Sequence, residues 1–306
     1  MSGLFTLGET MGLVAADSIG PLEYARGFSF AIGGAESNVA IGVARLGGTA
    51  TWLGRVGRDA TGDLIARRLV SEGVVAHVVR DDSFTGLMVR YRRTGALTHV
   101  DYHRAGSAGS RLAPADLPSA LDQADILHVT GITPALSSSA RAAVFQAVEQ
   151  ARAAGVTVSV DVNYRAKLWS RFDAAPVLRD LVSRADIAFA GPDEAALFVG
   201  DDDPVTGLAA LGPAEVVVKD GARGCAALID EQRYEVPAIT ATVVDPVGAG
   251  DAFVAGYLAD RMAGALPPAR LATAIAAGAF AVTVPGDCEG LPRRADLIAA
   301  TDNVAR

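Results

Sequence analysis

Cysteine, histidine and lysine are scarce in this chain of 306 residues. Its two cysteines, Cys225 and Cys288, are too few for a disulfide framework, so reduced thiols and a cytosolic protein are expected. The four histidines have no metal-ligand spacing, which argues against a zinc site. Lysine occurs only as Lys167 and Lys219, a bias that we attribute to genomic base composition because arginine supplies the other positive charges.

Basic clusters and long apolar runs are missing as well. The longest apolar stretch, 271–284, is too short to span a bilayer and predicts a buried helix. The first residues lack a basic region, so no signal peptide is expected. A net charge of −8 and a pI near 5.0 leave no basic surface that could displace the counterions of a nucleic acid. We therefore expect a cytoplasmic protein that binds neither nucleic acid nor membrane.

The apolar pattern predicts an α/β fold. From about residue 112 onward, short apolar runs alternate with helical segments, which favours a parallel sheet buried on both faces. Ligands of such sheets bind beyond the carboxyl ends of the strands, where the polar segments 161–165, 191–194 and 219–221 lie. Strands are expected at 126–130, 156–161, 187–190, 216–218 and 225–229, with helices at 137–154 and 174–183.

Two segments, 12–33 and 84–104, break this alternation. They are rich in Gly, Thr, Tyr and Arg, show a partial period of two, and lack helical spacing. This pattern predicts antiparallel strands outside the main sheet, although plain hairpins at its edge would give the same pattern. No linker, repeat or low-complexity tract divides the chain, so we expect a single domain over 1–306.

The run 245–253, Asp-Pro-Val-Gly-Ala-Gly-Asp-Ala-Phe, carries the clearest chemical signal. An extended segment over 239–244 is predicted to lead through it into a helix over 248–262. The first N–H groups of a helix have no partner within the helix and form an anion site. Here these groups belong to Gly248, Ala249 and Gly250.

An acid, Asp251, lies in the same first turn. A carboxylate would repel a bound phosphate, but it could accept the proton of a hydroxyl that attacks the phosphate. Aspartate also favours the first turns of helices because of the helix dipole alone. The complete run of nine residues favours phosphoryl transfer over simple capping.

This run resembles the C-terminal signature of the ribokinase-like (PfkB) carbohydrate kinases. A second family signature is found at 33–40, Gly-Gly-Ala-Glu-Ser-Asn-Val-Ala, and continues to 44–47, Ala-Arg-Leu-Gly. Both lie at the usual places, so the resemblance spans essentially the whole chain. It implies a three-layer α/β/α sandwich with a mostly parallel central sheet and a small β-sheet lid. In this family the lid often also mediates dimerisation, so a homo-oligomer is expected.

The resemblance implies ATP and Mg²⁺ as cofactors and assigns roles to several residues. Asp251 would be the general base, and the 248–250 turn would be the anion hole for the migrating phosphoryl group. The turn after strand 216–218 resembles the nucleotide loop of the family, although from sequence alone a simple left-handed turn is just as compatible. The nucleotide-binding residues would be Asn163, Lys219, Gly221 and Gly224.

The family motif Asn-x-x-Glu, which organises magnesium and phosphate-bound water, falls on 191–194. Its glutamate is kept as Glu194, expected to act on the metal through water, but Gly191 replaces the asparagine. This departure removes any side-chain contact from position 191. Glu194 could also be an ordinary acid at a helix N-terminus.

The acceptor site resembles that of 2-keto-3-deoxygluconate kinases within the family, which phosphorylate the 6-hydroxyl of a sugar acid. Arg104 and Arg165 are expected to face one cleft, and paired arginines suit a carboxylate better than a neutral hexose. A surface arginine paired with a nearby acid is the alternative for either one. The remaining substrate contacts would come from Gly34, Tyr102 and Asp287.

Other functions remain open from the residues. A fructokinase or ribokinase of the same family would share the run 245–253, and a non-catalytic sugar-binding regulator could keep the fold. A dinucleotide-dependent oxidoreductase is disfavoured, because the segment 8–12 is not a Gly-x-Gly-x-x-Gly turn entering a helix. The sequence does not distinguish gluconate-derived from galactonate-derived keto-deoxy acids.

Overall fold

A computed structural model describes residues 3–298, apart from 96, 120, 122 and 201–202. Over these residues the chain forms a nine-stranded sheet, in the order β13-β12-β11-β10-β9-β8-β1-β4-β5, and a four-stranded sheet, in the order β3-β2-β6-β7. The strands of the large sheet are β1 Leu4–Leu7, β4 Ala50–Gly57, β5 Val75–Asp81, β8 Ile126–Thr130, β9 Thr157–Asp161, β10 Ile187–Ala190, β11 Glu215–Lys219, β12 Cys225–Ile229 and β13 Gln232–Val236.

The strands of the large sheet from β5 to β11 are all parallel, as the apolar pattern predicts. Strands β1, β8 and β10 are buried along their whole length, because helices cover both faces of the sheet. The expectation that 225–229 continues the parallel series was wrong. β12 runs antiparallel to β11, since the five residues between Lys219 and Cys225 are too few for a parallel crossover.

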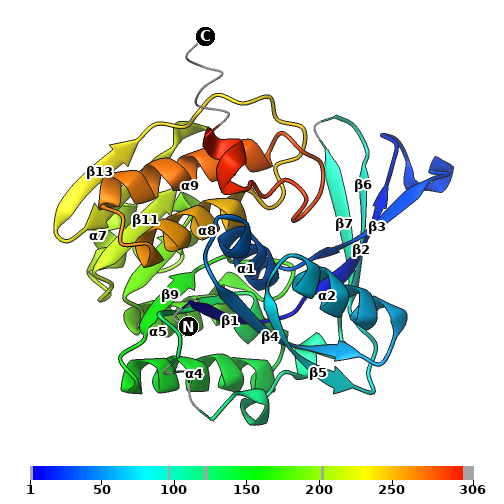
Figure 1. Cartoon of the computed structure of the whole chain (residues 1–306), viewed down its shortest axis with the longest axis horizontal. Helices are drawn as coiled ribbons and strands as arrows, with labels where there is room; N and C mark the ends of the chain where they lie inside the picture. Colours follow the sequence, from blue (N-terminus) through cyan, green and yellow to red (C-terminus); the bar gives the residue numbers. More distant parts are fainter. Residues whose placement is uncertain (1–2, 96, 120, 122, 201–202, 299–306) are drawn as a thin grey trace.

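Helices pack on both faces of the large sheet, which confirms the predicted three-layer sandwich (Figure 1). One layer consists of α1 Ala35–Arg45, α2 Ala60–Ser71, α8 Ala249–Met262 and α9 Pro267–Ala281. The other consists of α3 Thr133–Leu136, α4 Ser138–Ala153, α5 Arg171–Ser183, α6 Pro192–Ala195 and α7 Pro204–Ala209. Short 3₁₀ turns lie at Leu22–Tyr24, Gly109–Arg111, Pro114–Asp116 and Gly221–Arg223.

Side-chain caps start several of these helices where the sequence has short polar residues. Ser137 accepts a hydrogen bond from the N–H of Ala140 and so begins α4, as its serine-rich start predicts. Asp59 begins α2 in the same way, and Ser170 begins α5. Such a cap is worth about 0.5–2 kcal/mol, so these residues determine where each helix begins.

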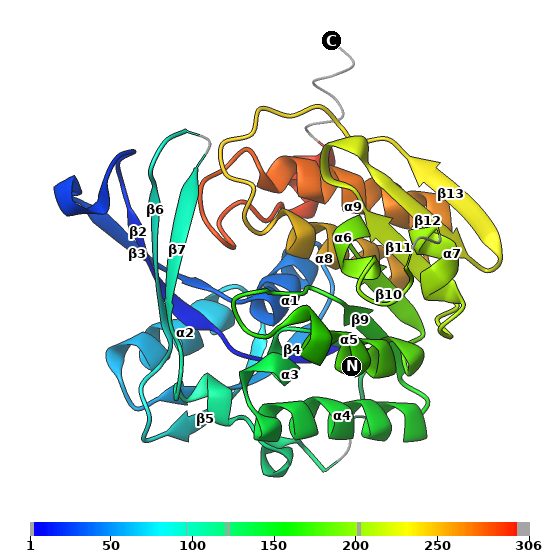
Figure 2. The ribbon, with the colours of Figure 1, turned by 180° about the vertical axis from the view of Figure 1, so that it is seen from behind.

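The small sheet stands beside the main body (Figure 2). Its strands fall within the segments 12–33 and 84–104 apart from the first residue of β2, and they are β2 Met11–Ala16, β3 Phe28–Gly33, β6 Leu87–Arg92 and β7 Thr98–His103. The β2–β3 and β6–β7 pairs are antiparallel, as expected, but β2 and β6 pair in parallel, so the sheet is mixed.

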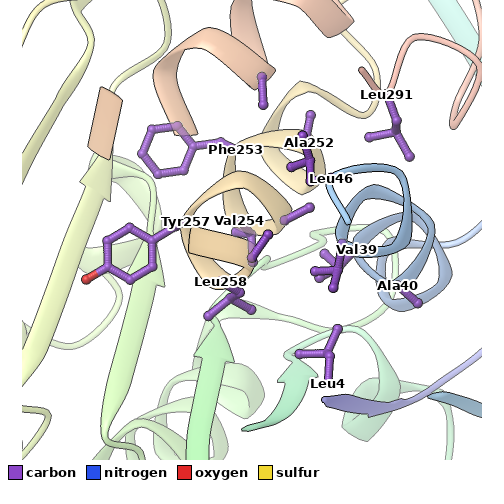
Figure 3. Close-up of a cluster of buried hydrophobic side chains, with 14 of the residues drawn as sticks. Leu4, Val39, Ala40, Leu46, Ala252, Phe253, Val254, Tyr257, Leu258 and Leu291 are labelled. Carbon is purple, nitrogen blue, oxygen red and sulfur yellow. The ribbon is translucent and has the colours of Figure 1, made fainter. Parts of the chain in front are cut away.

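Helix α8 lies between α1 and α9 in the core (Figure 3). Phe253 and Tyr257 point away from Val39 of α1, Leu258 points toward the strands of the large sheet, and Val254 lies between these two sides. All five are buried, and each such side chain contributes about 1.5–3 kcal/mol of hydrophobic stabilisation. This packing holds the N-terminus of α8 in place beside the ends of the parallel strands.

The start of α8 agrees with the prediction, but the segment before it does not. No strand forms at 239–244, and Ile239, Val243 and Val244 are exposed on a loop. The loop is tied down where the N–H of Val244 donates to Val282 O at 2.7 Å. Apolar residues alone were therefore a misleading strand signal here, because they have no neighbouring strand to pair with.

The apolar stretch 271–284 is mostly helical, as predicted. It forms the larger part of α9, which ends at Ala281. Leu271, Ala274 and Ala277 of this helix are fully buried. In the part of the chain that the structure describes, no helix is long and apolar enough to cross a membrane.

Candidate active site

Segments that are far apart in sequence meet at the carboxyl edge of the large sheet. Asn38, in α1, donates from Nδ2 to Asp251 Oδ2 at 2.8 Å and to Asp287 Oδ2 at 3.2 Å. Lys219, at the end of β11, donates from Nζ to Asp161 Oδ2, at the end of β9, at 2.6 Å. These contacts define a polar site at the edge where ligands of parallel sheets bind.

The corner before α8 is open to an anion. Gly248 has a left-handed φ of +77°, and a Cβ there would lie 2.3 Å from Asp287 O, so only glycine fits. Among the described residues, no acceptor is bonded to the N–H groups of Gly248, Gly250 or Asp251. The N–H of Ala249 makes only a long contact of 3.5 Å with Pro246 O. This corner can therefore donate several hydrogen bonds to a phosphate.

Asp251 is half-buried and faces this site. Burial raises the pKa of its carboxyl to about 7, and repulsion from Asp287 and Asp161 adds to the effect. The hydrogen bond from Asn38 and the charge of Lys219 act in the opposite direction. A carboxylate with a pKa near neutrality is well suited to accept a proton from a hydroxyl at physiological pH.

Asn38 was not assigned a role from sequence, although it belongs to the signature at 33–40. Its side chain is 2% exposed, and its Oδ1 has no partner within the described part of the chain. The side-chain amide of Asn38 therefore donates hydrogen bonds to two carboxylates, while its oxygen accepts none from the described residues. The sequence feature that could have pointed to Asn38 as a site residue is its position in a glycine-rich run at the start of a helix.

Lys219 brings a positive charge to the helix start. A Cβ on Gly250 would lie 3.6 Å from its Nζ, so the ammonium group is beside the anion site. Burial opposes the charge, but Asp161 and Glu194 outweigh it, and the pKa of Lys219 is raised. Lys219 therefore stays protonated and could contact a phosphate bound at this corner.

Asp161 and Glu194 are the carboxylates that could hold a metal ion. Asp161 is buried, and its Oδ1 has no partner among the residues described. Glu194 accepts the N–H of Gly191 at 2.7 Å and of Tyr164 at 3.0 Å, and burial followed by the charge of Asp161 raises its pKa. Over the described residues, no group of three or more metal-binding side chains occurs. Two carboxylates fit magnesium that keeps its waters and phosphate oxygens.

Three residues assigned to the nucleotide have left-handed backbone conformations, with φ of +39° at Asn163, +53° at Gly221 and +102° at Gly224. A Cβ on Gly224 would lie 2.0 Å from Val236 O, so packing against β13 explains this glycine. Gly221 has open space around it, where a ligand could approach. Asn163 is buried at the end of β9, and asparagine tolerates this conformation better than most residues.

Cationic side chains surround Tyr102, which is 41% exposed at the end of β7. The guanidinium carbon of Arg104 and Nζ of Lys167 each lie 5.7 Å from the centre of its ring. Lys167 also donates to Val100 O at 2.9 Å. Lys167 lies on the loop after β9, and Lys219 ends β11, so both lysines lie near the carboxyl ends of strands of the large sheet.

The two arginines assigned to the acceptor differ in their partners. Arg104 binds Glu9 through Nε at 2.7 Å and Nη2 at 2.5 Å, and Ser107 also donates to Glu9. Arg165 is exposed, and its Nη1 donates to Tyr164 O at 3.3 Å. Arg104 is therefore held rigidly by an acid that we did not foresee, whereas Arg165 is free to move.

Two further residues assigned to the acceptor lie near this group. A Cβ on Gly34 would be 2.5 Å from Glu9 O, so the chain passes too closely for a side chain. Asp287 is half-buried, and a Cβ on Gly33 would lie 2.1 Å from its Oδ2. Burial raises the pKa of Asp287, while Asn38 and the charge of Arg90 oppose this rise.

The sequence profile described as pfkB family carbohydrate kinase matches residues 1–294. The chain belongs to this family. It is therefore a carbohydrate kinase, as the resemblance of the run 245–253 implied.

Relatives that are named as sugar kinases cover most of the chain. A 2-dehydro-3-deoxygluconokinase of Bacillus subtilis is 36% identical over 95% of this chain and 93% of its own. A 2-dehydro-3-deoxygalactonokinase of Haloferax volcanii is 34% identical over 93% and 92%. A fructokinase of Klebsiella pneumoniae is 37% identical over a shorter span, 87% of this chain and 90% of its own.

Solved structures of the family share the fold closely. A PfkB protein from Polaromonas sp. JS666 is 36% identical with a TM-score of 0.89, covering 98% of this chain and all of the other. An Escherichia coli protein solved in complex with ATP and Mg²⁺ is 26% identical with a TM-score of 0.91, covering 99% of this chain and all of the other.

Proposed function

We propose that this carbohydrate kinase transfers the γ-phosphoryl group of ATP to the 6-hydroxyl of 2-keto-3-deoxygluconate. The observation that carries the proposal is the position of Asp251 beside the free N–H groups at the start of α8. The names of the Bacillus subtilis and Haloferax volcanii relatives support a keto-deoxy sugar acid as the acceptor.

In this proposal Asp251 accepts the proton of the sugar hydroxyl as the hydroxyl attacks the phosphorus. The N–H groups of Gly248 and Gly250 stabilise the charge that develops on the phosphoryl oxygens, at about 3–4 kcal/mol per donor. Lys219 adds a fixed positive charge beside them. Together the groups favour the transition state over the bound substrates.

The nucleotide end of the site would be formed by Asn163, Lys219 and Gly221. Asp161 and Glu194 would hold magnesium through water, and the ion would neutralise part of the phosphate charge. The free buried oxygen of Asp161 supports this placement. The ATP and Mg²⁺ in the Escherichia coli structure support the same pair of cofactors.

The acceptor end would bind the sugar acid through cations. Arg165 is exposed and can turn its planar guanidinium group to a carboxylate, which it would bind with two hydrogen bonds. Tyr102 would pack against the sugar, and Arg104, Gly34 and Asp287 would line the rest of this end.

One observation favours a fructokinase as the second candidate. Arg104 already has a carboxylate partner in Glu9, so its charge is balanced without any ligand. Only Arg165 would then be left for the acid group of a substrate. The similarity to a fructokinase of Klebsiella pneumoniae is compatible with this alternative.

A coupled ADP-release assay with a panel of sugars tests the proposal. We expect kcat/KM for 2-keto-3-deoxygluconate to exceed that for fructose and ribose by about 100-fold, the worth of a charge-assisted contact to the acid group. The galactonate-derived acid in the same panel determines the preference at C4. Fructose or ribose outperforming both acids would refute the sugar-acid proposal.

The activity should fall in acid because Asp251 must be ionised to accept a proton. Its pKa is raised to about 7, so kcat/KM should decrease about tenfold per pH unit below that value. The measurement is a pH profile of kcat/KM between about pH 5 and 9. A profile that stays flat down to pH 5 would contradict the assignment of Asp251 as the base.

We further propose that residues 1–306 act as one domain with the small sheet as a lid. Residues Phe28 and Phe30 of β3 project from the face of the small sheet opposite its buried Met11, Leu13 and Met88. Both phenylalanines are about half exposed, at 47% and 51%. An exposed apolar face of this kind is typical of a protein interface, which supports a homo-oligomer formed through the lid.

Phe30→Glu is expected to break this interface, because a charge would be buried at its centre. Light scattering after size exclusion should then give the monomer mass of 31.3 kDa, while the wild type gives a multiple of it. Phe172→Glu is the matched control, since Phe172 is 88% exposed on α5, and it should leave the mass unchanged. A monomeric wild type would rule out the oligomer.

A further inference from the structure

The side chain of Arg90 reaches from the small sheet into the main body. Arg90 lies on β6 and is 8% exposed. Its Nη1 is 3.3 Å from Asp245 Oδ2 and 3.8 Å from Asp287 Oδ1. These two acids lie on the loops before and after the α8–α9 pair, so one guanidinium group connects the small sheet with both loops.

Asp245 is a rigid anchor for this guanidinium group. It is 6% exposed, its Oδ1 accepts the N–H of Val247 at 3.1 Å, and its Oδ2 accepts the N–H of Gly286 at 3.1 Å. A buried charge is costly unless it is paired, so Arg90 cannot leave Asp245 without a large penalty. The position of Arg90 is therefore set by the two loops.

Asp287 depends on Arg90 for its charge balance. Its Oδ2 accepts from Asn38, and among the described residues the only cation in its ion pairs is Arg90. Asn38 donates from the same nitrogen to Asp251, so a continuous chain of contacts runs from Arg90 through Asp287 and Asn38 to Asp251. Two carboxylates on one amide repel each other, and a nearby positive charge makes their approach less costly.

We propose that Arg90 is a positioning residue for phosphoryl transfer: it holds Asp287 in place, and the shared amide of Asn38 then holds Asp251 toward the acceptor hydroxyl. This inference rests on the proposed kinase reaction and goes beyond it, because none of the assigned site residues explains why the two carboxylates stay together. The Nη1 of Arg90 is buried and makes no hydrogen bond within the described chain, so charge, rather than a hydrogen bond, provides this hold.

An alternative explanation is that Arg90 only holds the small sheet against the main body. A comparison with Arg92 distinguishes this explanation from the proposed positioning role. Arg92 lies two residues further along β6, on the same face, and its Nη1 donates to Val244 O at 3.2 Å. It therefore also connects β6 with the loop before α8, but it touches neither carboxylate. Arg92→Met removes a bridge of the same kind without disturbing the chain of contacts to Asp251.

The test compares wild type, Arg90→Met, Arg90→Lys and Arg92→Met in the ADP-release assay, with ATP and the best acceptor of the sugar panel. Arg90→Met should lower kcat by about 10–100-fold, the worth of an interaction with a charged group, with KM for ATP within about twofold. Arg90→Lys keeps the charge and should recover most of kcat. Arg92→Met should stay within about threefold of wild type, since surface contacts away from a site have small effects.

Two results would overturn the inference. One is a kcat of Arg90→Met within about threefold of wild type, and the other is an equal loss in Arg92→Met, which would assign the effect to closure of the small sheet. If Arg90→Met fails to fold, Arg90→Gln gives the same comparison without the charge. A wild type that prefers fructose would refute the sugar-acid proposal but leave this test intact, because the best acceptor is used.

Discussion

Replacing Asp251 by asparagine should lower kcat by about 10²–10⁴-fold, the usual contribution of a general base. Asparagine keeps the size of the side chain and can still accept the hydrogen bond from Asn38, but it cannot take the proton of the hydroxyl. Binding of the sugar should persist, so that the loss appears in kcat and not in KM. The coupled ADP-release assay measures both constants.

The melting temperature provides the control for this variant. Because burial raises the pKa of Asp251 from 3.8 to about 7, the folded protein loses stability as the pH rises through that window. Asp251→Asn removes this loss and should melt no lower than wild type at pH 8. A folded Asp251→Asn variant with normal kcat would refute the assignment of Asp251 as the base.

The wild-type protein tests a different alternative. If it binds sugar without any turnover, the chain is a sugar-binding regulator.

Arg165→Ala should raise KM for the keto-deoxy acid by about 10–150-fold, the worth of a charge-assisted contact to the acid group. The side chain is exposed and makes no ion pair among the described residues, so its removal leaves no buried charge unpaired. KM for fructose, measured in parallel, should change little. Steady-state kinetics with both sugars separate loss of acid recognition from general damage.

Arg179→Ala is the matched control for Arg165→Ala. Arg179 is an exposed arginine of α5, on the segment that follows the loop of Arg165. Its replacement removes the same charge from the protein and should leave both KM values unchanged. Equal KM changes in the two variants would mean that Arg165 acts only through the net charge, and would refute direct binding of the acid group.

Local sequence determined the start of α8 and the chemistry around it. Two glycines and an acid in one run require a tight corner and an acidic first turn whatever the rest of the chain does, and the structure has both at Gly248 and Asp251. The order of apolar runs likewise predicted the strands β8 to β11, because fully buried strands are apolar on both faces.

The sequence did not predict which side chains would meet. Asn38 and Asp251 are 213 positions apart, so no local pattern connects them. We assigned no role to Glu9 from the sequence, whereas the structure pairs it with Arg104. Arg90 looked like one of several arginines in a β segment, and only its position opposite Asp245 and Asp287 gives it a role.

This difference has a physical basis. Turn and helix geometry depend on backbone conformation over a few residues, so the sequence alone determined the tight corner at Gly248 and the acid beside it. The ionisation of Asp251 depends on its removal from water and on the charges of Asp161, Lys219 and Asp287, which reach it from other strands and loops. Only the tertiary structure decided that a common first-turn acid acquired a pKa near neutrality, as the proposed role of a base requires.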